Sequence, residues 1–352
     1  MDKNDKNKYR LSVAITWLRF PLIFFIIMLH CYSSVRLEGH HATYFKIVYP
    51  FSLWIGETGV PGFFFISGYL FFLSKKSYTE KLKTRFHTLF LPYILWNSIL
   101  LTTYLTAYAI GYPQDINNKN IADFCFMDYV RLFWDRGSYD NGNFVPLLCP
   151  FWYIRNLFIL CIISPLFYFI IRYVREIFLI VIAVWWLLTH DNAFMPQTIL
   201  FFSLGAYFSI LNINPLKVFS EKKTWILSLF YIFAIGDFFT HMVIGNPANL
   251  QIHRLALICN IPVLFLLADH CVQKGWSNKV FPESAFIIFA VHYPIVVVLR
   301  KFCAAKFAAA SDGTHILLFF ICILIATAAS LLIYLVLAKY FPKIKNILSG
   351  NR

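Results

Sequence analysis

Long apolar runs constrain this chain more than any other feature of its sequence. The first, residues 11–32, is almost wholly apolar and about long enough to cross a bilayer as a helix of roughly 20 residues. Hydrophobic residues make up 59% of the chain and charged residues only 14%, whereas about a quarter of a soluble domain is charged. The sequence therefore predicts an all-α, polytopic integral membrane protein with about ten transmembrane helices. The predicted spans are 11–33, 45–73, 88–112, 150–171, 177–190, 197–211, 225–243, 254–268, 283–300 and 315–341.

The basic residues follow a pattern that indicates orientation. The net charge of +14 could suggest a nucleic-acid partner, but the lysines and arginines gather in short loops between apolar runs. Such loops stay on the cytoplasmic side, so we expect both termini in the cytoplasm, a multi-pass location in the inner (plasma) membrane and no nucleic acid. The long loop 113–149 is richer in aspartate and is expected outside, whereas the basic segment 300–306 departs from the pattern. The basic cytoplasmic segments are 3–10, 74–87, 172–175, 217–223, 274–279 and 339–352.

No internal repeat, low-complexity tract or linker divides the sequence. Residues 1–352 are therefore expected to form a single transmembrane domain with no appended soluble domain. The eight cysteines lack the spacing of metal ligands, and we predict no metal site. Cys125 and Cys149 share the 113–149 loop and could form a disulfide if that loop faces an oxidising compartment.

Arg19 and His30 are ionisable residues within the first predicted span. Eleven residues at about 100° each amount to three turns plus roughly 20°, so both side chains lie on one helix face, about 16 Å apart along the axis. Ionisable side chains inside a membrane are costly and usually functional. The alternative is that Arg19 pairs with a buried carboxylate and that His30 is an interfacial histidine.

The second predicted span contains a group of helix-breaking residues, "GETGVPG" at 56–62. They predict a break near mid-depth, where irregular backbone is tolerated if it lines a cavity or is buried in protein. Glu57 lies at this break. It either neutralises Arg19 at a packed kink or shares a polar cavity with it. We predict a wet cavity that contains Arg19, Glu57 and also His292.

The pair Arg19 and His30 matches the R-x10-H pattern in the first helix of acyltransferase family 3, integral-membrane enzymes that modify sugars and cell-envelope glycans. The segment "GVPGFFFISGYLFF" (59–72) resembles the second-helix motif of this family. The resemblance extends in order over nearly the whole chain. The other similar segments are "FWYIRNLFIL" (151–160), "FFSLGAYFSI" (201–210) and "FAVHYPIVVVL" (289–299).

The resemblance implies an acyl-CoA donor, commonly acetyl-CoA, and a hydroxyl acceptor on an envelope polysaccharide or a lipid-linked glycan. It implies no bound cofactor, and membrane lipid surrounds the protein. Such a transfer needs a base near the acceptor hydroxyl and positive charge near the donor. His30 is the expected base, since imidazole titrates near neutral pH. Arg19 is the expected cation at the thioester carbonyl or the CoA phosphates, and we expect both residues to line one channel that the donor enters from the cytoplasm.

The candidate substrate contacts are Glu57, Trp152, Arg155 and His292. Arg155 could instead be an interfacial arginine in an aromatic belt, and His292 could be structural. Asp237, in a later span, could pair with an arginine. Ser67 is expected to allow close helix packing, because its surroundings do not form the G-x-S-x-G elbow of a nucleophilic serine.

Two functions of other classes are compatible with the same features. A polysaccharide or small-molecule transporter would explain the broken second span, but many transporters have an internal repeat, which this sequence lacks. A non-catalytic membrane subunit of an export complex would not depend on His30 for activity. Both alternatives remain open at the level of the sequence.

Overall fold

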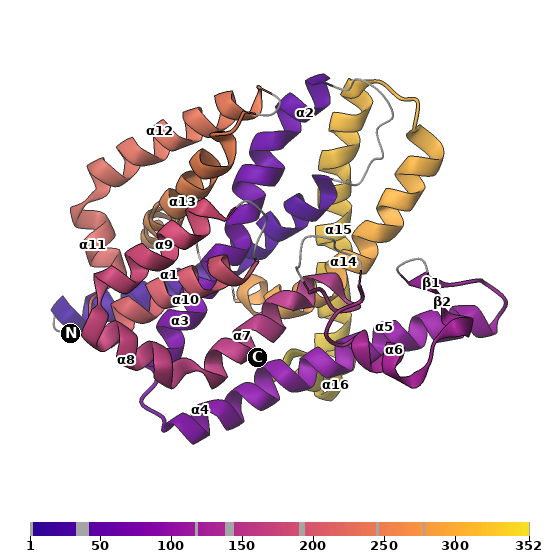
Figure 1. Cartoon of the computed structure of the whole chain (residues 1–352), viewed down its shortest axis with the longest axis horizontal. Coiled ribbons are helices and arrows are strands. Elements are labelled where there is room, and N and C mark those ends of the chain that lie inside the picture. Colours follow the sequence, from indigo (N-terminus) through magenta and orange to yellow (C-terminus); the bar gives the residue numbers. More distant parts are fainter. Residues whose placement is uncertain are drawn as a thin grey trace.

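The computed structural model describes residues 3–32, 42–116, 119–137, 144–189, 194–243, 246–276 and 279–351. Almost all of these residues are helical (Figure 1), which confirms the predicted all-α membrane fold. The α-helices are α1 (Lys3–Cys31), α2 (Ala42–Tyr49), α3 (Gly59–Leu73), α4 (Tyr78–Arg85), α5 (Leu91–Ala109), α6 (Phe126–Arg131), α7 (Trp152–Ile162), α8 (Ser164–Val174), α9 (Glu176–Leu188), α10 (Phe194–Ile210), α11 (Pro215–Glu221), α12 (Lys223–His241), α13 (Asn249–Gln273), α14 (Val280–Phe307), α15 (Asp312–Tyr340) and α16 (Pro342–Ser349). Short π-helical or 3-10 segments are η2 (Pro50–Ile55), η3 (Gly56–Thr58), η4 (Phe86–Phe90), η5 (Ile121–Asp123) and η6 (Cys149–Phe151).

Among the described residues, six helical segments are long and apolar enough to cross a membrane, or up to eight if each bent pair of helices is one span. The bent pairs are α7–α8, with an angle of 67°, and α10–α11, with an angle of 96°. Each of the ten predicted spans overlaps helix in the described residues, but not each is a continuous crossing. The 13 residues of α9 extend over about 20 Å, less than the roughly 30 Å of a hydrocarbon core. The second predicted span is divided into several pieces.

The second predicted span remains helical but changes its hydrogen-bonding pattern three times. Helix α2 passes into the π-helical segment η2, then into the 3-10 segment η3, and then into α3. Pro50 begins the irregular part, because proline cannot donate the amide hydrogen bond that continues an α-helix. The break thus covers residues 50–58 and begins earlier than predicted. Glu57 lies within it, in a kind of segment that is common at functional sites.

Helices α3 and α10 cross in backbone contact. A Cβ atom at Gly68 would lie 2.1 Å from the carbonyl oxygen of Phe202, and one at Gly205 would lie 1.9 Å from the carbonyl oxygen of Phe65. Only glycine lets two helix backbones approach this closely. The close helix packing that was expected at Ser67 is therefore present at this turn, but it depends on Gly68. The neighbouring Ser67 forms a hydrogen bond of 3.1 Å with the hydroxyl of a tyrosine on α7.

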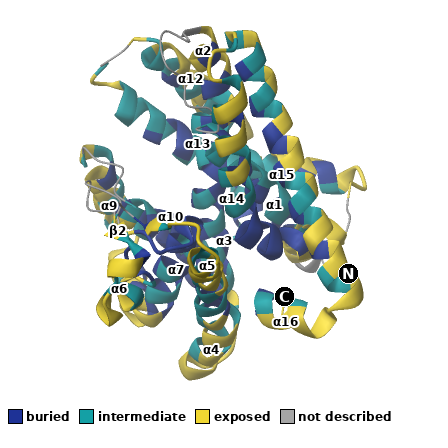
Figure 2. Cartoon of the chain, turned by 90° about the vertical axis from the view of Figure 1, so that its right-hand side faces the viewer, coloured by how far each residue is buried: buried dark blue, intermediate teal, exposed yellow. Residues whose placement is uncertain are grey.

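Helix α1 runs through the middle of the bundle and contacts α3, α13, α14 and α15. Its side chains Leu18, Leu22 and Ile23 are at most 1% exposed. Figure 2 shows buried residues gathered along α1, α3 and α14, whereas exposed residues cover much of α4 and α16. Arg19 and His30 therefore belong to a helix that is surrounded by protein.

The described parts of the 113–149 loop form a small unit beside α5, at the edge of the molecule (Figure 1). Strands β1 (Asp115–Ile116) and β2 (Lys119–Asn120) pair antiparallel in it. Lys119 Nζ donates a hydrogen bond of 2.7 Å to Asp128, which lowers the pKa of the Asp128 carboxyl to about 2. The disulfide considered for Cys125 and Cys149 is not formed. The apolar core of the unit consists of Ile116, Ile121, Leu132 and Leu147.

Orientation in the membrane is a prediction that cysteine labelling can check. All eight cysteines lie in described residues, and only Cys125 is exposed. A membrane-impermeant maleimide added to intact cells should label Cys125, because the 113–149 loop is expected outside. In the double variant Cys125→Ser/Lys76→Cys, position 76 is exposed in the 74–87 loop and should react only after the membrane is permeabilised. Labelling of position 76 in intact cells would reverse the predicted orientation.

Candidate active site

Helices α1, α3 and α10 line two cavities, one at each end of the three helices. The cavity at the end of α1 that carries His30 has a volume of about 200 Å³ and is termed the His30 cavity. The cavity at the opposite end contains Arg19, has a volume of about 370 Å³ and is termed the Arg19 cavity. Between them, the backbones of α3 and α10 touch, and the buried Leu22 packs against Gly62. The structure thus has two cavities where one channel was predicted.

His30 lies at the last turn of α1 and borders the His30 cavity. Its ring centroid is 5.3 Å from that of His292 and 5.1 Å from that of Tyr293, both on α14. Among the described residues, neither ring nitrogen of His30 has a hydrogen-bond partner. The imidazole is thus held by ring packing, while its nitrogens are available to a substrate.

His292 lies behind His30 and is fully buried. Its Nδ1 donates a hydrogen bond of 3.1 Å to the carbonyl oxygen of Ile288, one turn earlier in α14. Its Nε2 has no partner among the described residues and is therefore an unprotonated acceptor in this tautomer. The ring of His292 thus packs against that of His30. His292 does not border either cavity.

Glu57 borders the same cavity as His30 because η3 packs against the last turn of α1. A Cβ atom at Gly56 would lie 3.0 Å from the backbone nitrogen of Leu29, so the neighbours Glu57 and His30 lie at the same level. The predicted pairing of Glu57 with Arg19 and the predicted shared cavity are wrong. Arg19 lies about 16 Å further along the helix axis, far beyond the reach of a carboxylate.

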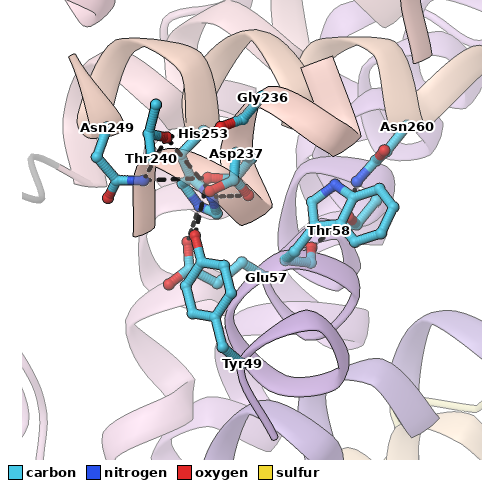
Figure 3. A network of polar contacts seen from close by, with 10 residues as sticks. Tyr49, Glu57, Thr58, Gly236, Asp237, Thr240, Asn249, His253 and Asn260 are labelled. Carbon is cyan, nitrogen blue, oxygen red and sulfur yellow. Dashed lines mark hydrogen bonds and ion pairs between the residues drawn. The ribbon is translucent and has the colours of Figure 1, made fainter. Parts of the chain in front are cut away.

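Glu57 belongs instead to a polar network that joins α2, η3, α12 and α13 (Figure 3). Its Oε2 is 3.0 Å from Nε2 of His253 on α13, and Nδ1 of His253 is 3.0 Å from Oδ2 of Asp237 on α12. The hydroxyl of Tyr49 donates a hydrogen bond of 2.8 Å to the other oxygen of Asp237. Asn249 contacts the same oxygen at 3.4 Å. The prediction that Asp237 pairs with an arginine is therefore wrong, because its partner is His253.

His253 and Arg254 are cavity residues that the sequence analysis missed. Both border the His30 cavity, and Arg254 is only 3% exposed. The predicted span began at residue 254, so the histidine was left in a loop, although α13 begins at Asn249. The rule that intramembrane ionisable residues are functional could have found both. Arg254 is bound through Nη1 to the carbonyl oxygens of Trp186 and Thr189, and its guanidinium lies 5.4 Å from the Trp186 ring.

Trp152 gives the His30 cavity an aromatic wall. Its ring stacks on Phe194 with centroids 3.9 Å apart and an interplanar angle of 10°. Trp186 and Phe289 border the same cavity, as does the amide side chain of Gln197. The cavity thus combines aromatic faces with a few polar groups, which is the usual character of a site for a small organic ligand.

Arg155 does not border the His30 cavity, although it lies one turn after Trp152. Its guanidinium donates hydrogen bonds to the carbonyl oxygens of Trp134, at 2.5 Å, and Phe144, at 2.8 Å. It also lies 4.8 Å from the ring centroid of Trp134. The structure thus uses Arg155 to attach the 113–149 loop to α7 and does not bring it together with the other candidate residues.

Arg19 borders the Arg19 cavity together with polar residues of three elements. Among the described residues it has no carboxylate partner and no hydrogen bond, so its predicted pairing with a buried carboxylate is not found. A cation inside a membrane protein is costly without a counter-charge. The cavity is therefore suited to an anionic ligand. Its polar residues are Lys8, Ser12, Thr16, Arg19, Tyr69, Ser209, Asn212 and Asn214.

A family model described as an acyltransferase domain matches residues 12–335 of this sequence. The chain belongs to acyltransferase family 3. This family-3 chain is 26% identical over 307 residues to the succinoglycan biosynthesis protein ExoH of Rhizobium meliloti (strain 1021), and the match covers 81% of this chain and 79% of ExoH. No solved structure matches the chain.

Membership in family 3 decides between the classes of function that the sequence left open. The protein is a multi-pass membrane O-acyltransferase, and the transporter and export-subunit alternatives are set aside. In the described part of the chain, no group of three or more histidine, cysteine, aspartate or glutamate side chains could hold a metal ion.

Proposed function

We propose that this protein resides in the inner membrane and transfers an acyl group, in the first place acetyl, from acyl-CoA to a sugar hydroxyl. The acceptor is an envelope polysaccharide or its lipid-linked precursor. The observation that carries the proposal is His30, whose ring nitrogens lack partners among the described residues and which borders a cavity with aromatic and polar walls. The similarity to a protein of succinoglycan biosynthesis supports a polysaccharide acceptor.

In the proposed reaction, a ring nitrogen of His30 removes the proton of the acceptor hydroxyl as its oxygen attacks the thioester carbonyl carbon. A carbon–oxygen bond forms, the carbon–sulfur bond breaks, and the proton passes from the imidazolium to the departing thiolate. Atoms and charge balance without a further reactant. His292 and Tyr293 pack against the imidazole and hold it at the cavity wall.

The Arg19 cavity is the proposed site of the donor. CoA carries several phosphate charges, and the cavity presents Lys8 together with a guanidinium that has no carboxylate partner among the described residues. The cavity also reaches Leu73 and Asn214, which precede the basic segments 74–87 and 217–223. We place the nucleotide of CoA at this end of α1. Its flexible thioester arm must then extend over the roughly 16 Å along α1 that separates Arg19 from His30. Because Leu22 packs against Gly62 between the two cavities, the proposal requires α1 and α3 to part at this level during transfer.

The activity is tested with the purified full-length protein in detergent. The donors are isotope-labelled acetyl-CoA and, in parallel, longer and carboxylated acyl-CoAs. The acceptor is glycan extracted from a strain that lacks the gene. We expect label to be transferred to the glycan, and mass spectrometry of the product identifies the ester. Absence of transfer from every acyl-CoA would contradict the proposal.

The substitution Arg19→Lys tests the donor site. Lysine keeps the charge but loses the planar fork that binds a phosphate or carboxylate bidentately. Loss of one charge-assisted hydrogen bond corresponds to about 10- to 100-fold in affinity. We therefore expect the KM for acyl-CoA to rise by about this factor, with normal membrane insertion and an unchanged KM for the glycan.

The matched control for this variant is Arg172→Lys, the same change at an exposed arginine of α8 that borders neither cavity. It should leave both KM values unchanged. An unchanged KM for acyl-CoA in Arg19→Lys would contradict the proposal that the donor binds in the Arg19 cavity.

A further inference from the structure

We infer that Asp237 and His253 fix Glu57 as the hydrogen-bond acceptor for a second hydroxyl of the acceptor sugar, and thereby select which hydroxyl is acylated at His30. This inference rests on the proposed function and adds a positioning group to it. It is carried by the network of Figure 3, which joins a buried carboxylate to the wall of the His30 cavity.

The geometry of His253 defines the charge of this network. Both of its ring nitrogens are 3.0 Å from carboxylate oxygens, one of Asp237 and one of Glu57. An ionised carboxylate only accepts hydrogen bonds, so two such bonds require a proton on each ring nitrogen. The imidazolium then compensates one of the two carboxylates, and the three side chains together carry one negative charge.

That surplus charge is available to a ligand at Glu57 only. Asp237 is 1% exposed, and its oxygens are engaged by His253, Tyr49 and Asn249. The side chain of Glu57 is 31% exposed and borders the His30 cavity. Asp237 borders a different cavity and not the His30 cavity, whereas Glu57 presents to the His30 cavity a carboxylate whose direction is set from behind by His253.

The surroundings of Glu57 favour a sugar hydroxyl as its ligand. A carboxylate accepts hydrogen bonds from hydroxyl groups, while the stacked rings of Trp152 and Phe194 offer an apolar surface for the C–H face of a sugar ring. The volume of about 200 Å³ is below the roughly 300–1,000 Å³ of sites for drug-sized ligands, so the cavity suits a single sugar unit of a longer glycan.

The position of Glu57 relative to His30 links this hydrogen bond to the choice of hydroxyl. Gly56 and Leu29 are in backbone contact, and the residues that follow them, Glu57 and His30, border one cavity. A sugar that donates one hydroxyl to Glu57 is therefore limited in the hydroxyl that it can present to His30. Because Glu57 is already engaged by His253, we assign to it the positioning of the acceptor and leave removal of the proton to His30.

The test compares Glu57→Gln, Asp237→Asn and the double variant with wild type, using deacylated glycan from the deletion strain and labelled acetyl-CoA. We expect Glu57→Gln to raise the KM for glycan by about 10- to 100-fold, the range for one hydrogen bond to a charged group, with an unchanged KM for acetyl-CoA. We also expect the ester, located by NMR of the product, to be distributed over more than one hydroxyl.

The double variant separates positioning from a purely structural role. If Asp237 acts through His253 on Glu57, Asp237→Asn should raise the KM for glycan in the wild-type background and have no further effect in Glu57→Gln. The matched control is Glu283→Gln, an exposed glutamate of α14 that accepts a hydrogen bond from Tyr334. It should change neither KM nor the position of the ester.

Two outcomes overturn the inference. One is an active Glu57→Gln enzyme with an unchanged KM for glycan and an unchanged ester position. The other is a double variant in which the effects of Glu57→Gln and Asp237→Asn on the KM for glycan are strictly additive in free energy. If Asp237→Asn fails to fold, the cavity-facing Glu57→Gln variant decides by itself. If wild type transfers no acyl group at all, the proposed function and this inference both fail, whereas normal wild-type transfer with the first outcome overturns the inference alone.

Discussion

Replacement of His30 by alanine should abolish most acyl transfer while the protein remains at its normal level in the membrane. Loss of a general base typically lowers a rate by about 10²- to 10⁴-fold. No other histidine of the described chain borders the His30 cavity except His253, whose nitrogens are both engaged by carboxylates. The effect should therefore appear in kcat. The measurement is the initial rate of label transfer from acetyl-CoA to deacylated glycan by equal amounts of purified protein.

The control for this prediction is His87→Ala, which removes an exposed histidine that borders neither cavity. It should retain wild-type kinetics. A His30→Ala enzyme with a rate within a few-fold of wild type would show that another group removes the proton. This result would contradict the catalytic role of His30.

Replacement of Gly205 by alanine should prevent normal folding of the membrane domain. The new Cβ atom would lie 1.9 Å from the carbonyl oxygen of Phe65, and neither atom can move by rotation of a side chain. Overpacking of a core typically costs about 1–3 kcal/mol, and a clash between two helix backbones is expected at or above the upper end of this range. We expect little folded protein, and a lowered midpoint of thermal unfolding in detergent for any that is recovered.

The control is Gly313→Ala, in the first turn of α15, where the nearest atom to a new Cβ is Ser311 Oγ at 3.9 Å. This change meets only an ordinary contact and should leave the unfolding midpoint within a few degrees of wild type. Gly205→Ala protein with wild-type stability would mean that α3 and α10 are further apart than the structure places them.

Helical geometry alone placed Arg19 and His30 on one face of α1. The structure confirms this face, because residues of the same stripe line both cavities, from Lys8 at one end to His30 at the other. The expectation of one channel was wrong for a reason that the spacing does not contain. At mid-length, Gly68 and Gly205 bring α3 and α10 into backbone contact, so that the cavities lie at the two ends.

The partners of the polar residues could not be derived in the same way. Glu57 was expected either to neutralise Arg19 or to share a polar cavity with it, because it lies at the break near mid-depth of the second predicted span. Its true partner, His253, lies 196 positions later in the chain. Arg155 shows the converse case, since its sequence neighbourhood suggested a substrate contact whereas its hydrogen bonds attach a loop.

The sequence by itself determined the helical membrane fold, the acyltransferase family and the helix face that carries Arg19 and His30. The fold and the helix face follow from hydropathy and from the 3.6-residue period, and the family from the resemblance of short motifs; all of these are properties of short stretches of chain. Only the tertiary structure decided that Glu57 joins His253 and Asp237, and that Arg19 has a cavity of its own. Such partnerships depend on which helices become neighbours and at what level they cross, and contacts such as that of Gly56 with Leu29 set this level only in the folded chain.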